Sequence, residues 1–135
     1  MDAAELKEFA TRYTAAWRSQ DANTVAAFFA ENGTLNINDG TPSVGRSAIT
    51  AAAQGFMTAF PDMVVTMDEI IPLDRERAVY RWTLMGKNLG PGGTGGAVRI
   101  SGYEEWTMGA EGLIEDSKGH FDEADYRRQL ETDAI

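Results

Sequence analysis

Cysteine is absent from this 135-residue chain, and histidine occurs once, as His120. Without cysteine the chain forms neither disulfides nor thiolate sites, and a single histidine excludes a histidine-rich metal site. Basic residues are also scarce, because 12 Lys and Arg stand against 21 Asp and Glu, for a formal net charge of -9. Nucleic acids and anionic membranes are bound through basic surfaces, so we expect neither as a partner.

Long apolar runs are missing as well. No uninterrupted run approaches the roughly 18 residues of a membrane span. The start, MDAAELKEFA, lacks the basic residues and apolar core of a signal peptide. We therefore expect a soluble, cytoplasmic protein. The apolar fraction of 43% and charged fraction of 24% are typical of a globular protein. The length suits a single domain over residues 1–135.

Apolar residues recur at helical spacing in three segments of the first half of the chain. The first predicted helix covers residues 3–18. The second begins after Asp21 as its N-cap, and buries Phe29 before closing at Gly33. The third ends before Pro61, because proline restricts the residue that precedes it.

Beyond Pro61 the apolar period changes to two, which is typical of strands. In the segment 77–86, one parity should face the core and the other should face outward. Further strands are predicted at 34–38, 63–71, around 100–108 and at 113–121, and a short helix at 122–131. Helices followed by long strands favour an α+β fold, with helices on one face of an antiparallel sheet.

The stretch GKNLGPGGTGGAVRISG, residues 86–102, is crowded with glycine. A phosphate-binding loop needs a helix that begins directly after the glycines, with its N-terminus pointing at the anion. Here the glycines lie between two predicted strands and no Gly-Lys-Ser/Thr follows. We therefore expect a long strand connection at the rim of a pocket and no nucleotide site.

Several segments in order resemble one family. They are YTAAWRSQDANTVAAFFAENG, MTAFPDMVVTMDEIIPLDRERAVYRWTLMGKNLG, EGLIED and FDEADYRRQL. Together they are similar to the SnoaL-like polyketide cyclases of the nuclear transport factor 2-like superfamily, which includes the ketosteroid isomerases. The resemblance covers nearly the whole chain. It implies a cone in which a strongly curved antiparallel sheet wraps three helices around a deep apolar pocket.

The resemblance also implies a small hydrophobic ligand with a carbonyl group, no cofactor, and a homodimer formed through the outer face of the sheet. Val79, Thr83 and Met85 have the outward parity that such a contact needs. In characterised cyclases an Asp removes a proton next to a carbonyl, and a His assists. Here the position of that Asp falls near Gly119, and a family His position is occupied by Asn88.

The base of the ketosteroid isomerases would fall near Ile37, so that mechanism does not carry over either. Glu104 then becomes the main candidate for a base, because it interrupts an apolar strand face and buried acids are rare unless paired or functional. A structural Glu104 is an equal alternative. His120 is a candidate partner for Glu104, and Asp122 is a second candidate base or the N-cap of the last helix.

Eight residues are candidates to bind the ligand. Six are aromatic residues on the apolar faces, and the alternative for these is a purely structural role in the core. Two are asparagines that would polarise a carbonyl of the ligand, a role that is also open to Tyr13. The eight residues are Tyr13, Trp17, Asn36, Phe56, Phe60, Trp82, Asn88 and Trp106.

Two classes of function remain open from the sequence. The first is a cyclase or isomerase that moves a proton next to a carbonyl, and the second is a non-catalytic ligand-binding or interaction domain. A third option is hydrolysis by an Asp-Arg-Asp set, as in epoxide hydrolases that share the cone. That set cannot be assembled here, because Arg81 and Arg99 both have outward parity.

Overall fold

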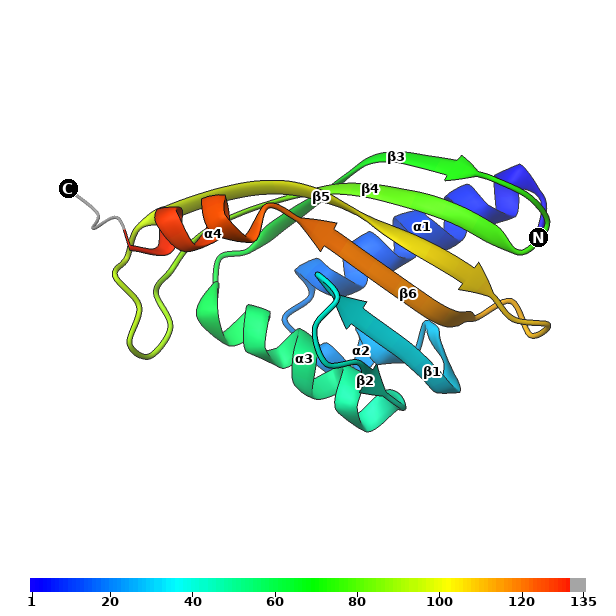
Figure 1. The fold of residues 1–135 in the computed structure, drawn as a ribbon, viewed down its shortest axis with the longest axis horizontal. Helices are drawn as coiled ribbons and strands as arrows, with labels where there is room; N and C mark the ends of the chain where they lie inside the picture. The colour runs from blue at the N-terminus through cyan, green and yellow to red at the C-terminus, as the bar shows by residue number, and fades with distance from the viewer. Residues whose placement is uncertain (132–135) are drawn as a thin grey trace.

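The computed structural model describes residues 1–131 and shows an α+β fold (Figure 1). The elements in chain order are α1 (Ala3–Arg18), α2 (Ala22–Ala26), β1 (Phe29–Ile37), β2 (Ser43–Val44), α3 (Arg46–Ala59), β3 (Val64–Pro72), β4 (Arg77–Lys87), β5 (Ala97–Met108), β6 (Ile114–Phe121) and α4 (Glu123–Leu130). The sheet curves over α1, α2 and α3, and α4 lies against β5 at one end. The predicted fold class is confirmed.

The six strands form one open sheet in the order β2-β1-β6-β5-β4-β3. All neighbours are antiparallel except β1 and β6, which run parallel. The sheet is thus antiparallel as predicted, apart from this one parallel pair. A parallel pair needs a long crossover, and the chain between β1 and β6 supplies one that includes α3 and four strands.

The first helix begins with a capping box. Asp2 accepts a hydrogen bond from the backbone N–H of Glu5 at 2.8 Å, and Glu5 accepts from the N–H of Asp2 at 3.2 Å. This reciprocal pair satisfies two backbone donors that an uncapped helix would leave free. The helix then buries Leu6, Phe9 and Tyr13 against the sheet.

The second helix is shorter than predicted. Asp21 is its N-cap, as expected, but the helix ends at Ala26, and Phe29 already belongs to β1. Phe29 is fully buried and pairs with Ile114 of β6. Gly33 is not a helix terminus; it lies at an irregularity of β1, where a Cβ would be 2.9 Å from the carbonyl oxygen of Ile114. Strand pairing overrides the helical spacing here.

The alternation predicted for residues 77–86 is confirmed in β4. Tyr80 and Leu84 are buried on the inner face, whereas Arg81 and Met85 are exposed on the outer face. Thr83 is also on the outer face but is buried, because its hydroxyl contacts Asp68 at 2.6 Å and Ser101 at 2.7 Å.

The glycine-rich stretch connects β4 to β5, as predicted, with positive φ angles of 78° at Gly92 and Gly95. Gly90 approaches the end of α3 closely: its N–H donates to the carbonyl of Ala59, and a Cβ would be 2.3 Å from the Thr58 carbonyl oxygen. The glycines therefore serve turns and close backbone contact. Within residues 1–131 no helix is long and apolar enough to span a membrane.

Candidate functional site

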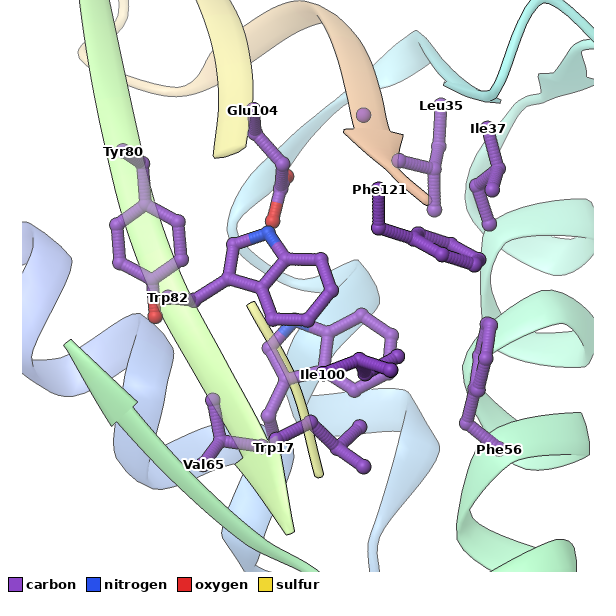
Figure 2. A pocket seen from close by; sticks show the side chains of 12 residues that line it. Trp17, Leu35, Ile37, Phe56, Val65, Tyr80, Trp82, Ile100, Glu104 and Phe121 are labelled. Atoms are coloured by element: carbon purple, nitrogen blue, oxygen red, sulfur yellow. The ribbon is translucent and has the colours of Figure 1, made fainter. Parts of the chain in front are cut away.

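A cavity of about 60 Å³ lies between the inner face of the sheet and the helices (Figure 2). Seven of its twelve lining residues are buried, and the five that are partly exposed are aromatic except for Ile37. The lining residues are Trp17, Leu35, Ile37, Phe56, Val65, Tyr80, Trp82, Leu84, Ile100, Glu104, Gly119 and Phe121.

Glu104 is the one acidic residue in this lining, and its side chain points into the cavity (Figure 2). Glu104 as a whole is only 7% exposed to solvent. Three donors from three elements hold one carboxylate oxygen, Oε1: the hydroxyl of Tyr13 at 2.9 Å, the indole N–H of Trp106 at 3.1 Å and the hydroxyl of Ser117 at 2.7 Å. Three donors saturate one oxygen and fix the orientation of the carboxylate.

The second oxygen of Glu104, Oε2, differs from Oε1 in its hydrogen bonding. It accepts no hydrogen bond from any residue between 1 and 131, yet protein atoms do not fully enclose it. Because Glu104 lines the cavity, this oxygen is available to accept a hydrogen bond or a proton from a bound molecule.

Burial raises the pKa of Glu104 above its ordinary value of 4.5, and the hydrogen bonds from Ser117, Trp106 and Tyr13 offset part of the rise. Burial also raises the pKa of Tyr13 and of Tyr80, so both phenols stay protonated at neutral pH. A raised pKa makes the ionised carboxylate a stronger base than an exposed glutamate.

Gly119 lies directly beside Glu104, because the two residues pair across β5 and β6. A Cβ at Gly119 would be 3.8 Å from Cγ of Glu104. A methyl group at Gly119 would also be 3.4 Å from the carbonyl oxygen of Asn36, so it would fit there in ordinary contact beside Glu104. The resemblance to polyketide cyclases places a catalytic Asp near Gly119, and here a carboxylate from the neighbouring strand reaches the adjoining space.

Three of the eight predicted ligand-binding residues line the cavity, namely Trp17, Phe56 and Trp82. Phe60 is fully buried in the core and is not among the lining residues. Tyr13 and Trp106 are also buried in the core, and their polar atoms contact Glu104. The hydroxyl of Tyr13 is thus a hydrogen-bond partner of the carboxylate.

The two predicted asparagines lie elsewhere. Asn36 stands between Leu35 and Ile37, which both line the cavity, so its own side chain has the opposite parity and donates to the carbonyl of Gly40 at 2.6 Å. Asn88 belongs to the loop after β4 and is not among the lining residues.

The predicted pair of His120 and Glu104 does not form. The residue opposite Glu104 on β6 is Gly119, and His120, one position further, faces the outer side of the sheet. There its Nε2 contacts Oε2 of Glu105 at 2.8 Å, and its ring stacks on Tyr103 with centroids 4.7 Å apart. His120 therefore cannot assist a reaction at Glu104.

Asp122 lies outside the cavity as well. It is the N-cap of α4, and its side chain accepts from the backbone N–H of Asp125 at 3.0 Å. Of its two predicted roles the structure shows the cap, so Glu104 is left as the one predicted base that reaches the cavity.

Sequence reasoning missed Ser117, which is fully buried and makes the shortest contact with Glu104. Ser117 and Gly119 share one face of β6, so the alternation was visible, but the register that brings β6 beside Glu104 was not. Asn38 was missed too. Its Oδ1 accepts from the backbone of Phe121, a lining residue, and its buried Nδ2 has no partner among residues 1–131.

No metal site accompanies the carboxylate. Among the described residues there is no group of three or more His, Cys, Asp or Glu that could hold a metal ion.

Residues 7–130 match the family described as SnoaL-like polyketide cyclase. The chain belongs to this family. The match covers all four helices apart from the first turn of α1, and all six strands, so this SnoaL-like domain contains both the sheet and the cavity. No match was found among curated proteins.

Solved structures share the fold at low sequence identity. A putative SnoaL-like polyketide cyclase from Jannaschia sp. CCS1 has a TM-score of 0.78 at 12% identity, covering 99% of each chain. SalBIII, an epoxide hydrolase/cyclase-like enzyme in pyran ring formation, has a TM-score of 0.78 at 20% identity, over 92% of this chain and 95% of that one.

A third structure, a hypothetical protein with a ketosteroid isomerase-like fold from Catenulispora acidiphila, was solved in complex with trimethylamine. It has a TM-score of 0.79 at 16% identity, over 91% of this chain and 92% of that one. At such identities these neighbours establish the fold alone.

Proposed function

We propose that this SnoaL-like domain binds a small, largely hydrophobic carbonyl compound in the cavity, and that Glu104 moves a proton at the carbon next to the carbonyl. The observation that carries the proposal is that the two oxygens of the Glu104 carboxylate differ in their hydrogen bonds. Oε1 is held by three donors, while Oε2 has no partner among residues 1–131 and borders the cavity. A base whose position is fixed in this way is oriented before the substrate arrives.

The proton transfer follows from the chemistry of a carbonyl. Oε2 of the ionised carboxylate takes a proton from the adjacent carbon, and the electron pair of the broken C–H bond moves toward the carbonyl oxygen to form an enolate. In an isomerase the protonated Glu104 returns the proton to another carbon. In a cyclase the enolate carbon attacks a second carbonyl, and the alkoxide that forms takes the proton back from Glu104. Burial supports the first step because it raises the pKa of Glu104.

An enolate needs a donor near its oxygen. The indole N–H of Trp82 is the best candidate, since Trp82 lines the cavity and its N–H has no partner within residues 1–131. In Figure 2 the nitrogen of the Trp82 indole is on the edge of the ring that is turned toward the Glu104 carboxylate. We therefore assign Trp82 the role that the sequence had left to Tyr13 or Asn36.

The lining also indicates the kind of ligand. Trp17, Phe56 and Phe121 are partly exposed around the opening, and together with Tyr80 they offer aromatic faces to a flat molecule. A cavity of about 60 Å³ accepts only a small group as it stands. A ligand with a fused ring would need the partly exposed Trp17 and Phe56 side chains to rotate outward.

The proposal is tested by hydrogen–deuterium exchange at carbon, which needs no knowledge of the natural substrate. Small aryl ketones such as 2-tetralone are incubated with the protein in D₂O, and loss of the proton signal next to the carbonyl is followed by NMR. We expect faster exchange than in buffer, and a decrease of about a hundredfold in the protein-dependent rate for Glu104→Gln. Glu105→Gln removes the same charge one residue away, on the outer face, and should leave the rate unchanged.

A non-catalytic ligand-binding domain is the second candidate. It is favoured by the absence of an acid at position 119 and of a histidine at position 88, and by the neighbour that was solved with trimethylamine. Ketones that quench the tryptophan fluorescence of the protein, and so bind, without any acceleration of exchange would support this candidate and sink the first.

A further inference from the structure

The cavity carries an unbalanced charge. Glu104 is buried, and each of its three partners is a neutral donor. No Lys, Arg or His is among the lining residues. A buried carboxylate is normally paired with an opposite charge, because neutral hydrogen bonds replace only part of its lost hydration. An ionised Glu104 therefore leaves room for a positive charge in the cavity.

Aromatic side chains surround the same carboxylate. Tyr80 pairs with Glu104 across β4 and β5, and its ring lines the cavity. Trp82 lies over Gly102, where a Cβ would be only 2.7 Å from Cζ2 of the indole. Phe121 meets Trp82 at 69°, with ring centroids 6.0 Å apart. The faces of aromatic rings attract cations, tryptophan most strongly.

We propose that this cavity binds a small alkylammonium cation, with Oε2 of Glu104 as the counter-ion and Tyr80, Trp82 and Phe121 as the walls. Gly119 pairs with Glu104 and also lines the cavity, so the cation approaches the carboxylate on a side without a side chain from β6. The net charge of -9 also raises the concentration of cations near the protein.

The lining distinguishes an alkylammonium group from other cations. A metal ion needs several oxygen ligands, and the cavity offers one free carboxylate oxygen among apolar walls. A guanidinium or primary ammonium group carries several N–H donors that would stay unsatisfied there. A tertiary or quaternary ammonium group carries one N–H or none, and its methyl groups suit the aromatic walls.

This binding does not rest on proton transfer. A cation held at Oε2 would occupy the position of the reacting carbon, and so it would compete with a carbonyl ligand. The proposal also predicts a dependence on pH. The titratable groups facing Glu104 are Tyr13 from α1 and Tyr80 from β4, which stay neutral, and β6 contributes only Ser117 and Gly119. Cation affinity should therefore rise with pH as Glu104 ionises, and then level off.

The experiment compares choline with 3,3-dimethyl-1-butanol, which has the same shape with carbon in place of the charged nitrogen. Binding is measured by tryptophan fluorescence and NMR at a pH of about 8, where carboxylates are ionised. We expect choline to bind about tenfold or more tightly than the alcohol. The anion 3,3-dimethylbutyrate should bind most weakly of the three.

Two variants of equal net charge isolate the role of the carboxylate. Glu104→Gln should abolish the preference for choline, whereas Glu105→Gln, on the outer face, should keep it. Thermal melting checks that both variants fold. Trp82→Leu is a further variant, and it should weaken choline binding more than binding of the alcohol, because leucine keeps an apolar wall but has no ring face.

The proposal is overturned if the alcohol binds as tightly as choline, if choline does not bind, or if Glu104→Gln keeps the preference. These outcomes are separate from the ketone experiment. If the protein accelerates ketone exchange but shows no preference for choline, this proposal is refuted and the proposed function stands. If it prefers choline but does not accelerate exchange, the cation site stands and the proposed function is refuted.

Discussion

Ser117→Ala tests whether the carboxylate of Glu104 is held as an ionised group. The substitution removes a hydroxyl 2.7 Å from Oε1 at a fully buried position. A hydrogen bond to a charged acceptor contributes about 1.5–3 kcal/mol, and one between neutral groups about 0.5–1.5 kcal/mol. The variant should therefore lose more stability when Glu104 is ionised than when it is protonated.

The sign of the pH dependence follows from the raised pKa of Glu104. In the native protein this pKa lies above the ordinary value of 4.5, so the folded state holds the proton more tightly than the unfolded chain. The contribution of Glu104 to the free energy of unfolding is then fully present below about 4.5, and it is lost as the pH rises through the folded-state pKa. Ser117→Ala removes a hydrogen bond that lowers the pKa of Glu104, so the pKa rises further and the loss extends to higher pH.

Urea unfolding followed by tryptophan fluorescence measures this difference. We expect Ser117→Ala to destabilise the protein by about 1 kcal/mol more at a pH of about 8 than at a pH of about 4, which lies below the ordinary pKa of the carboxyl. Ser101→Ala is the matched control, because Ser101 bonds to Thr83 on the outer face and does not touch Glu104. An equal loss of stability at both pH values would refute the reasoning, since Glu104 would then not be the group that Ser117 stabilises.

Four further predictions concern other parts of the molecule. Asp122→Ala should cost about 1 kcal/mol in thermal or urea unfolding, as expected for an N-cap, and leave ketone exchange unchanged; a loss of exchange would return Asp122 to the list of bases. Gly90→Ala should destabilise by about 1–3 kcal/mol, because its Cβ would overlap the carbonyl of Thr58. Gly55→Ala, in α3 with nothing within 4 Å, should stabilise by about 0.5–1 kcal/mol, and a loss instead would mean that the helix is not formed there. The homodimer stays a prediction: light scattering should show a dimer that Met85→Glu, an exposed outer-face change, converts to a monomer, and a monomeric native protein would contradict it.

The acid of the site could be predicted, but its partners could not. Glu104 stands out in the sequence because it interrupts the apolar parity of its strand between Ile100 and Trp106. Tyr13 lies 91 positions away and Ser117 13 positions away, on other elements. Only the packing of α1 onto the sheet and the register of β6 bring both hydroxyls to the same oxygen.

His120 shows how strand register determines which side chains meet. Glu104 and Glu105 are adjacent in the sequence, and a histidine near them was a reasonable partner for either. Since successive strand residues face opposite sides, the pairing of Glu104 with Gly119 sends His120 to Glu105 on the outer face. A register shifted by one residue would have placed His120 beside Glu104, and nothing local in the sequence excludes it.

The sequence by itself determined the fold class, most of the helices and strands, and the presence of one acid on an apolar strand face. These follow from periodicity and capping, which act over a few residues along the chain. The tertiary structure alone decided that β1 runs parallel to β6, that three donors hold one oxygen of Glu104, and that Asn36, Asn88, His120 and Asp122 lie outside the cavity. These features depend on strand register and helix packing between distant segments, which local periodicity does not encode.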